Sequence, residues 1–168
     1  HLEAYSQASG MRLVAACDVD ESALAQAQHA HGLERTYTDY AQLLKDPQVD
    51  VVSICTPDHL HAEQALAALD AGKHLLVEKP MCTSVEDAHS LVAKVRVTGC
   101  KLAVGNVLRF YPQFVAAQKI ISDGRLGELF HVEGDYIHDC RDIYDKTPWR
   151  KDPRNPQCIV LGGAVHPL

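Results

Sequence analysis

Four short, almost unbroken runs of apolar residues constrain the fold of this 168-residue chain more than any other feature of its sequence. Runs that are continuous, instead of alternating between apolar and polar residues, are typical of strands buried on both faces, as in parallel sheets. The runs occupy residues 13–17, 51–55, 75–77 and 102–104.

Helical patterns fill the intervals between these runs. Asp20, Thr38 and Ser84 are placed to cap three of the helices at their N-termini, and Asp87 completes a capping box with Ser84. Strands that alternate with helices through short connections predict an α/β fold, a parallel sheet with helices on both faces. The predicted helices span residues 1–9, 20–31, 38–46, 59–71 and 84–98. The last of them is predicted to bury one face, made of Val85, Ala88, Leu91, Val92 and Val95.

The pattern changes after Gly105. A helix is predicted from Pro112 to about Ser122, followed by a longer strand over residues 127–138. Residues 139–157 are polar and rich in Pro, Arg and Asp, which predicts a loop. We therefore place a domain boundary near residue 106.

Composition excludes several classes of function. The chain is 46% hydrophobic and 23% charged, which is ordinary for a globular protein. Its net charge of -6 argues against binding to nucleic-acid backbones, which requires a basic face. No apolar stretch approaches the roughly 18–20 residues of a membrane span. The six cysteines form no C-x-x-C pair, so we expect reduced thiols in a cytoplasmic protein.

No metal site is predicted. The pairs His29/His31 and His59/His61 have i, i+2 spacing. Side chains two residues apart on a helix diverge, so neither pair is placed to ligate one ion.

The polar residues after the apolar runs are candidates for ligand binding, because ligands of open parallel sheets bind beyond the carboxyl ends of the strands. Asp18 follows the first run. An acid at this place in a dinucleotide-binding fold accepts hydrogen bonds from the adenosine ribose and repels a 2′-phosphate, which favours NAD over NADP. Asp18 equally suits the role of a helix cap or a solvated loop acid.

The glycine-rich turn that accompanies such an acid is absent, because no G-x-G-x-x-G occurs in the chain. This turn lies roughly 20 residues before the acid, and only 17 residues precede Asp18. We therefore expect the turn and its strand to lie upstream of His1, and the sequence to be a fragment.

Lys79 is the candidate for proton transfer. A lysine at a partly buried strand end can have its pKa lowered towards about 7 to 8, which suits general acid–base chemistry. A simple ion pair with the adjacent Glu78 is the alternative. His166, close to a pair of glycines, is a further candidate for handling a proton, although a lone histidine near a chain end is more often incidental.

The order of these pieces resembles the Gfo/Idh/MocA family, which comprises glucose–fructose oxidoreductase, inositol dehydrogenase and related NAD(P)-dependent enzymes. The resemblance covers nearly the whole chain. Its motifs are T-P-D-H-L-H (56–61), A-G-K-H-L-L-V-E-K-P (71–80), R-F-Y-P (109–112), P-W-R (148–150) and G-G-A-V-H-P (162–167).

The resemblance implies a Rossmann domain, here residues 1–106 without its first strand and glycine turn, and then the start of an open-sheet α/β domain over residues 107–168. It also implies that the enzyme moves hydride between a sugar or cyclitol carbon and NAD, that Lys79 exchanges the hydroxyl proton, and that the Lys79–Pro80 peptide is cis. A homo-oligomeric parent protein is expected. The implied cofactor-binding residues are Asp18, Cys55, Thr56, Pro57, His61, Glu78, Lys79 and Pro80. The implied substrate-binding residues are Arg109, Tyr111, Trp149, Arg150 and His166.

Two positions depart from the family pattern. Gly162 stands where many members carry an aspartate four residues before the histidine, and Val107 stands where an asparagine is usual. Three alternatives therefore remain: a regulator that senses NAD or sugar without catalysis, an NAD-assisted glycosidase of the same family, and an inactive fragment.

Overall fold

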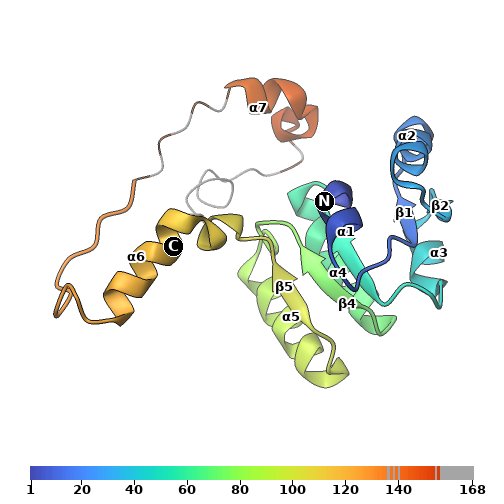
Figure 1. Ribbon diagram of the computed structural model, residues 1–168. Helices are drawn as coiled ribbons and strands as arrows, with labels where there is room; N and C mark the ends of the chain where they lie inside the picture. The colour runs from blue at the N-terminus through green and yellow to red at the C-terminus, as the bar shows by residue number, and fades with distance from the viewer. Residues whose placement is uncertain (136, 138, 140, 154, 156–168) are drawn as a thin grey trace.

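The computed structural model describes residues 1–135, 137, 139, 141–153 and 155. Within them, five short strands form two parallel sheets, one of two strands in the order β1-β2 and one of three in the order β3-β4-β5. Helices connect the strands (Figure 1). The predicted α/β class with parallel strands is confirmed.

The first sheet pairs β1 (Ala15–Cys17) with β2 (Arg35–Tyr37), and α2 (Glu21–His31) connects them. The side chain of Asp20 accepts hydrogen bonds from the first turn of α2 as predicted, and Gly32 ends the helix in a left-handed conformation with φ of 64°. Strand β2 was not predicted, because three residues that include an arginine do not make an apolar run.

The second sheet positions the site. Strand β3 (Val51–Ile54) pairs with β4 (His74–Val77), which pairs with β5 (Leu102–Val104). Ile54 and Val77 are buried, as expected for strands covered by helices. The 3-10 turn η1 (Asp58–Leu60) and α4 (His61–Asp70) connect β3 to β4, and α5 (Val85–Thr98) connects β4 to β5.

Among the residues that the structure describes, no strand-to-strand ladder joins the two sheets, which differs from the single sheet that was predicted. Side-chain hydrogen bonds join elements around the second sheet to α1 (Leu2–Gln7) and to the end of α3 (Tyr40–Lys45). The hydroxyl of Tyr5, on α1, lies 2.8 Å from the hydroxyl of Ser53 on β3. Lys73 donates to the carbonyl oxygen of Asp46 at 2.9 Å.

Helix α3 (Tyr40–Lys45) begins one residue later than predicted. Asp39, not Thr38, is its N-cap, and its side chain accepts a hydrogen bond from the backbone of Ala41. A carboxylate accepts such a bond more strongly than a neutral hydroxyl does, which accounts for the choice between adjacent candidates.

The core lies between α4, α5 and the second sheet. Leu69 and Leu91 are among its fully buried side chains. The buried face of α5 is narrower than predicted: Leu91 is fully buried, but Val85 and Val92 are 65% and 45% exposed. Helix α4 covers a single stripe of α5, and the valines flanking that stripe remain in contact with water.

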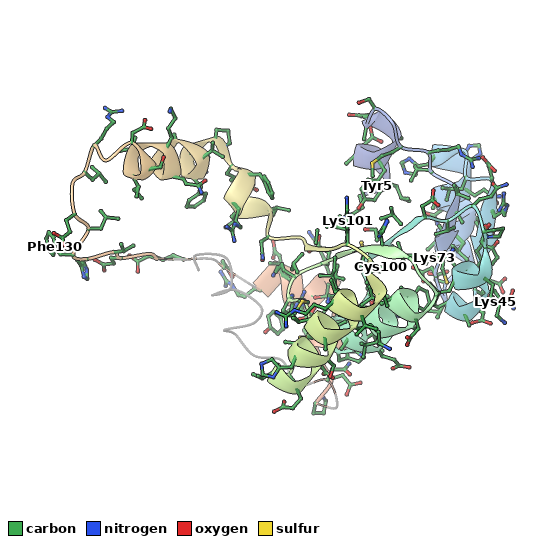
Figure 2. The ribbon with its side chains drawn as sticks, turned by 90° about the horizontal axis from the view of Figure 1, so that it is seen from below. Tyr5, Lys45, Lys73, Cys100, Lys101 and Phe130 are labelled. Carbon is green, nitrogen blue, oxygen red and sulfur yellow. The ribbon has the colours of Figure 1, made fainter. Side chains whose placement is uncertain are left out.

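The chain beyond β5 contains η2 (Val107–Phe110) and then α6 (Pro112–Ser122), the predicted helix. The predicted strand over 127–138 is wrong, because the described residues of that segment form no strand. A strand requires a hydrogen-bonding partner, and no described strand lies beside this one. Figure 2 labels Phe130, which is 99% exposed, in the first part of this segment.

The loop predicted over residues 139–157 contains two short helices, α7 (Arg141–Lys146) and η3 (Pro148–Lys151). The prediction was wrong there because polar composition was taken as evidence against helix. Local bonds favour these turns: the hydroxyl of Thr147 donates to the carbonyl oxygen of Ile143. None of the helices in the described part of the chain is long and apolar enough to cross a membrane.

Candidate functional site

A cavity of about 290 Å³ opens where β3 and β4 end. Parallel strands present their carboxyl ends at the same edge, so the residues that follow β3 and β4 meet there. A third segment, around η3, contributes the opposite part of the lining. The lining residues are Cys55, Thr56, Pro57, Asp58, His61, Glu78, Lys79, Thr147, Trp149 and Arg150.

Lys79 is half-buried in this cavity. Burial lowers the pKa of its ammonium group, and the positive charge of Arg150 lowers this pKa further. Asp58 and Glu78 act in the opposite direction. The net shift is downward, so the neutral amine is more accessible here than in a solvated lysine.

Glu78 is held by the backbone amide of the next residue and by the side chain of His1. Its carboxylate accepts a hydrogen bond from the amide of Lys79 at 3.0 Å, and its other oxygen lies 2.7 Å from Nε2 of His1. Gly105, at the end of β5, leaves room for this carboxylate. A Cβ atom at position 105 would lie 3.3 Å from three atoms of the Glu78 carboxyl group, tighter than ordinary contact.

His61 lies at the back of the site, 1% exposed. Its Nδ1 is 2.7 Å from the carbonyl oxygen of Pro80, and its Nε2 is 2.8 Å from the carbonyl oxygen of Thr56. The ring therefore bridges the segment after β3 and the segment after β4. The predicted cis peptide between Lys79 and Pro80 is confirmed.

Asp58 and Arg150 face each other across the cavity. Nη1 of Arg150 is 4.0 Å from Oδ2 of Asp58, and both side chains are largely buried. The guanidinium also lies over the ring of Trp149, at 4.2 Å from the ring centroid. The contact brings η3 to the second sheet and places two charges of opposite sign near Lys79.

Most of the predicted site residues that the structure describes meet in this cavity or, like Pro80, border it. Three do not. Asp18 is exposed at the end of β1, where its Oδ1 accepts a hydrogen bond from the amide of Asp20 at 3.0 Å. Arg109 in η2 and Tyr111 directly after it are exposed and do not line the cavity. His166 and Gly162 lie outside the described residues.

Cys55 lines the cavity with its thiol. Burial raises the pKa of this thiol, and the negative charge of Glu78 raises it too, although a contact with Ser53 acts in the opposite direction. The thiol therefore stays protonated at neutral pH, and it is not poised as a nucleophile.

Asp58, Thr147 and Gly105 belong to the site but were not predicted. Asp58 follows the Thr56-Pro57 pair directly, so its position after a strand was a usable signal. Gly105 contributes space and not a functional group, and only the structure shows what a side chain there would meet. Nothing in the sequence around Thr147 distinguishes it from a loop residue.

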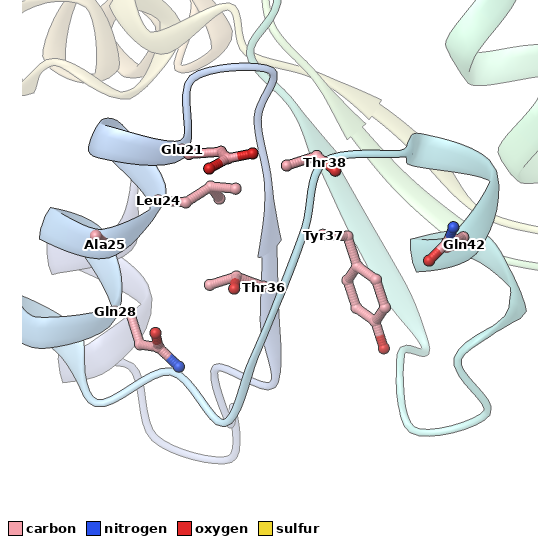
Figure 3. Close-up of a pocket in the computed structure, with 8 residues that line it drawn as sticks. All are labelled: Glu21, Leu24, Ala25, Gln28, Thr36, Tyr37, Thr38 and Gln42. Atoms are coloured by element: carbon pink, nitrogen blue, oxygen red, sulfur yellow. The ribbon is translucent and has the colours of Figure 1, made fainter.

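A second cavity, of about 320 Å³, lies between α2 and β2 and is lined by none of the predicted site residues. Figure 3 shows Glu21 and Thr38 near one end of it and Gln28 near the other. Its lining is mostly neutral, so we place the candidate site at the first cavity. Among the described residues, no group of three or more His, Cys, Asp or Glu side chains is arranged to hold a metal ion.

Comparison with known proteins bears on this geometry. Residues 1–106 match the model of an oxidoreductase family with an NAD-binding Rossmann fold, the Gfo/Idh/MocA family. Levoglucosan dehydrogenase of Pseudarthrobacter phenanthrenivorans is 33% identical over 132 residues, 79% of this chain and 32% of that protein. D-apiose dehydrogenase of Paraburkholderia graminis is 31% identical over 168 residues, 100% of this chain and 44% of that protein.

Among solved structures, scyllo-inositol dehydrogenase from Lactobacillus casei with bound NAD(H) and scyllo-inositol aligns with a TM-score of 0.88 at 22% identity. The alignment covers 99% of this chain and 49% of that one, and at this identity it shows the fold. The chain thus spans less than half the length of each of these relatives. The family match over residues 1–106, together with a lysine-bearing cavity at the strand ends, shows that the chain belongs to the Gfo/Idh/MocA family of oxidoreductases.

Proposed function

We propose that the protein containing this chain is an NAD-dependent dehydrogenase that oxidises a hydroxyl group of a sugar or cyclitol, with Lys79 as the proton acceptor. One observation supports this most strongly. Lys79, with its lowered pKa, lies in a cavity at the strand ends of a chain from an oxidoreductase family. The reverse reaction uses the same residue as the proton donor.

The residues at the strand ends fit a nicotinamide cofactor. Thr56, Pro57 and Glu78 would hold it, with Asp18 at the adenosine ribose. The side-chain oxygen of Asn106 is buried, and within the described residues it has no hydrogen-bond partner, so it is available to a ligand amide. When bound, NAD accepts the hydride that leaves the substrate carbon. The carboxylate of Asp18 supports NAD over NADP.

Lys79 performs the proton transfer in this proposal. Its amine takes the proton of the substrate hydroxyl while the carbon–oxygen bond gains carbonyl character. Only the neutral amine can accept a proton, so burial and the charge of Arg150, which lower its pKa, favour the active form. A downward shift therefore extends the activity to lower pH.

The wall around η3 supports a polyhydroxylated substrate. Trp149 offers a flat apolar surface, and the guanidinium of Arg150 offers hydrogen-bond donors to hydroxyl oxygens. The relatives named after levoglucosan and D-apiose act on molecules of this chemistry by their names. We propose Arg109, Tyr111 and His166 as further substrate contacts.

We also propose that residues 1–106 form the cofactor-binding domain and that residues 107–168 begin the substrate domain. A homo-oligomer is proposed because the segment after β5 carries large exposed apolar side chains, among them Phe110 at 78% and Phe130 at 99%. A cytoplasmic location is proposed because the described cysteines are free thiols.

The test is Lys79→Ala in the intact protein, with NAD reduction followed during incubation with a panel of sugars and cyclitols. We expect turnover to fall by about 100-fold or more, which is typical for a general base, while NADH still binds. Lys101→Ala, at an exposed lysine that directly precedes β5, is the matched control and should leave turnover unchanged. Unaltered turnover in Lys79→Ala would overturn the assignment. Saturable NADH binding without oxidation of any substrate would favour a sensor instead.

A further inference from the structure

The side chains of His1, at the N-terminus of α1, and Tyr5, within this helix, contact each other and polar groups of the second sheet. Nε2 of His1 lies 2.7 Å from Oε1 of Glu78, and Nδ1 lies 3.2 Å from the hydroxyl of Tyr5. That hydroxyl in turn lies 2.8 Å from the hydroxyl of Ser53 on β3. Both ring nitrogens of His1 are therefore engaged, one by the candidate site and one by the helix that the residue begins.

These contacts form a continuous polar chain that joins the two strand ends of the cavity. At one end of the chain is Glu78, which directly follows β4. At the other end, the hydroxyl of Ser53 lies 3.6 Å from the sulfur of Cys55, which directly follows β3. Glu78 and Cys55 both line the cavity, whereas His1 and Ser53 do not. Helix α1 therefore connects the two lining segments from outside the cavity.

The carboxylate of Glu78 keeps room for a ligand although it is held on two sides. His1 contacts Oε1, and the backbone amide of Lys79 donates to Oε2. A carboxylate has about four lone-pair directions in all, so about two remain for other partners. Because these oxygens accept hydrogen bonds, a ligand group that meets them must be a donor, such as a ribose hydroxyl or a carboxamide N–H.

The contact between His1 and Glu78 is too exposed to act mainly on stability. The two side chains are 37% and 29% exposed, and exposed pairs of this kind contribute little to the free energy of unfolding. A glutamate side chain does, however, have several rotamers, and fixing one of them costs free energy when a ligand binds. A contact that fixes the carboxylate beforehand therefore strengthens ligand binding.

We propose that His1 is a positioning residue for the cofactor: it holds the Glu78 carboxylate in the orientation that accepts a hydroxyl or amide donor of the nicotinamide nucleotide. Tyr5 fixes the ring of His1 for this purpose through its contact with Nδ1. The inference rests on the proposed use of Glu78 in cofactor binding, and it does not require Lys79 to transfer a proton.

The test is the dissociation constant of NADH, measured by cofactor fluorescence on the intact protein and on three variants at position 1. His1→Leu removes both contacts. His1→Gln places an amide nitrogen near the position of Nε2, and His1→Asn places one near that of Nδ1. We expect the constant to rise by about 5- to 10-fold in His1→Leu and His1→Asn, the effect of about one hydrogen bond, and to stay within about twofold of the parent value in His1→Gln.

A double-mutant cycle separates positioning from a general effect on α1. In a Glu78→Ala background, His1→Leu should cause no further rise in the dissociation constant, because the group that the ring holds is gone. His89→Leu, at an exposed histidine of α5, is the matched control and should bind NADH like the parent. The Tm of each variant, measured on the same samples, should change little.

Unchanged NADH binding in His1→Leu would overturn the proposal, as would an equal loss of binding with and without Glu78. If His1→Leu weakens NADH binding through Glu78 in a protein that oxidises no sugar or cyclitol, the positioning role stands and the proposed reaction fails. Turnover that depends on Lys79, together with unchanged NADH binding in His1→Leu, would retain the reaction and reject the positioning role.

Discussion

Nη1 of Arg150 lies 4.0 Å from Oδ2 of Asp58, and both side chains line the cavity that contains Lys79. The two charges have opposite effects on the lysine. Arg150 lowers the pKa of Lys79, second in size only to burial, and Asp58 raises it. The pH at which the neutral amine becomes available therefore depends on residues from both sides of the cavity.

Replacing Arg150 with glutamine removes the positive charge that disfavours protonation of Lys79. The pKa of Lys79 should rise, so the fraction of neutral amine at a given pH should fall. We expect the rise of kcat with pH to move to higher pH, which a pH–rate profile of Arg150→Gln will detect. A matched change outside the cavity, Arg96→Gln in the last turn of α5, should leave the profile in place.

Asp58→Asn should shift the same profile in the opposite direction. Without the carboxylate the ammonium form of Lys79 loses a favourable partner, its pKa falls further, and the neutral amine appears at lower pH. Because Arg150 also loses its ion-pair partner, a lower free energy of unfolding is expected alongside the shift. A profile that moves to higher pH would contradict this account of the charges.

Gly105→Ala tests whether the absence of a side chain at position 105 sets the position of the Glu78 carboxylate. The added Cβ would stand 3.3 Å from the Glu78 carboxyl group, the flexible end of a side chain, so the carboxylate should move and the fold should survive. We expect a small change in Tm and weaker NADH binding, measured by cofactor fluorescence. In a Glu78→Ala background the same glycine substitution should have no further effect, since the group it displaces is gone.

Asp46 makes stability depend on pH. The backbone amide of Gln48 is the largest cause of its lowered pKa, and Arg35 and Tyr37 act in the same direction. A carboxyl group with a folded-state pKa below its unfolded value of about 3.9 contributes stability above that value, and this contribution is lost as the pH falls through the folded pKa. Urea unfolding at a series of acidic pH values should show this loss in the parent protein. Asp46→Asn should show a flatter curve.

Leu91 and Val85 compare a buried position with an exposed one on the same helix. Leu91 is 0% exposed, so Leu91→Ala should lower the free energy of unfolding by about 2–5 kcal/mol through the cavity it leaves. Val85 is 65% exposed, and Val85→Ala should change it by no more than about 0.5 kcal/mol. Denaturant titration measures both. Similar losses at the two positions would show that α5 is packed differently.

Much of the second sheet could be predicted because its signals are local. Continuous apolar runs marked β3, β4 and β5, and Ser84 and Gly99 marked the ends of α5 through their own hydrogen bonding and conformation. Strand β2 has no apolar run. It is a strand because it pairs with β1, and that pairing cannot be read from its own three residues.

Those residues of the candidate site that come directly after a strand could be predicted from the sequence. Lys79 and Thr56 are there because β4 and β3 end side by side. The contact between Asp58 and Arg150 was not predictable, because it joins two 3-10 turns, η1 and η3, that are far apart in the chain. The two carbonyl partners of His61 could not be predicted either, because every residue has a backbone oxygen and the sequence does not show which ones a side chain will contact.

Two groups of residues line the cavity, and they differ in whether a sheet holds their backbone. Lys79 lies at the end of the hydrogen-bonded strand β4 and His61 begins α4, whereas Trp149 and Arg150 come from a short turn outside both sheets. Changes at Thr147 and Trp149 can alter which hydroxyl is presented without removing a charge that acts on Lys79, whereas a change at Arg150 also alters the pKa of Lys79. For anyone redesigning substrate scope on this scaffold, residues 147–149 are the part to vary, and residues 55–61, residues 78–80 and Arg150 are the part to keep.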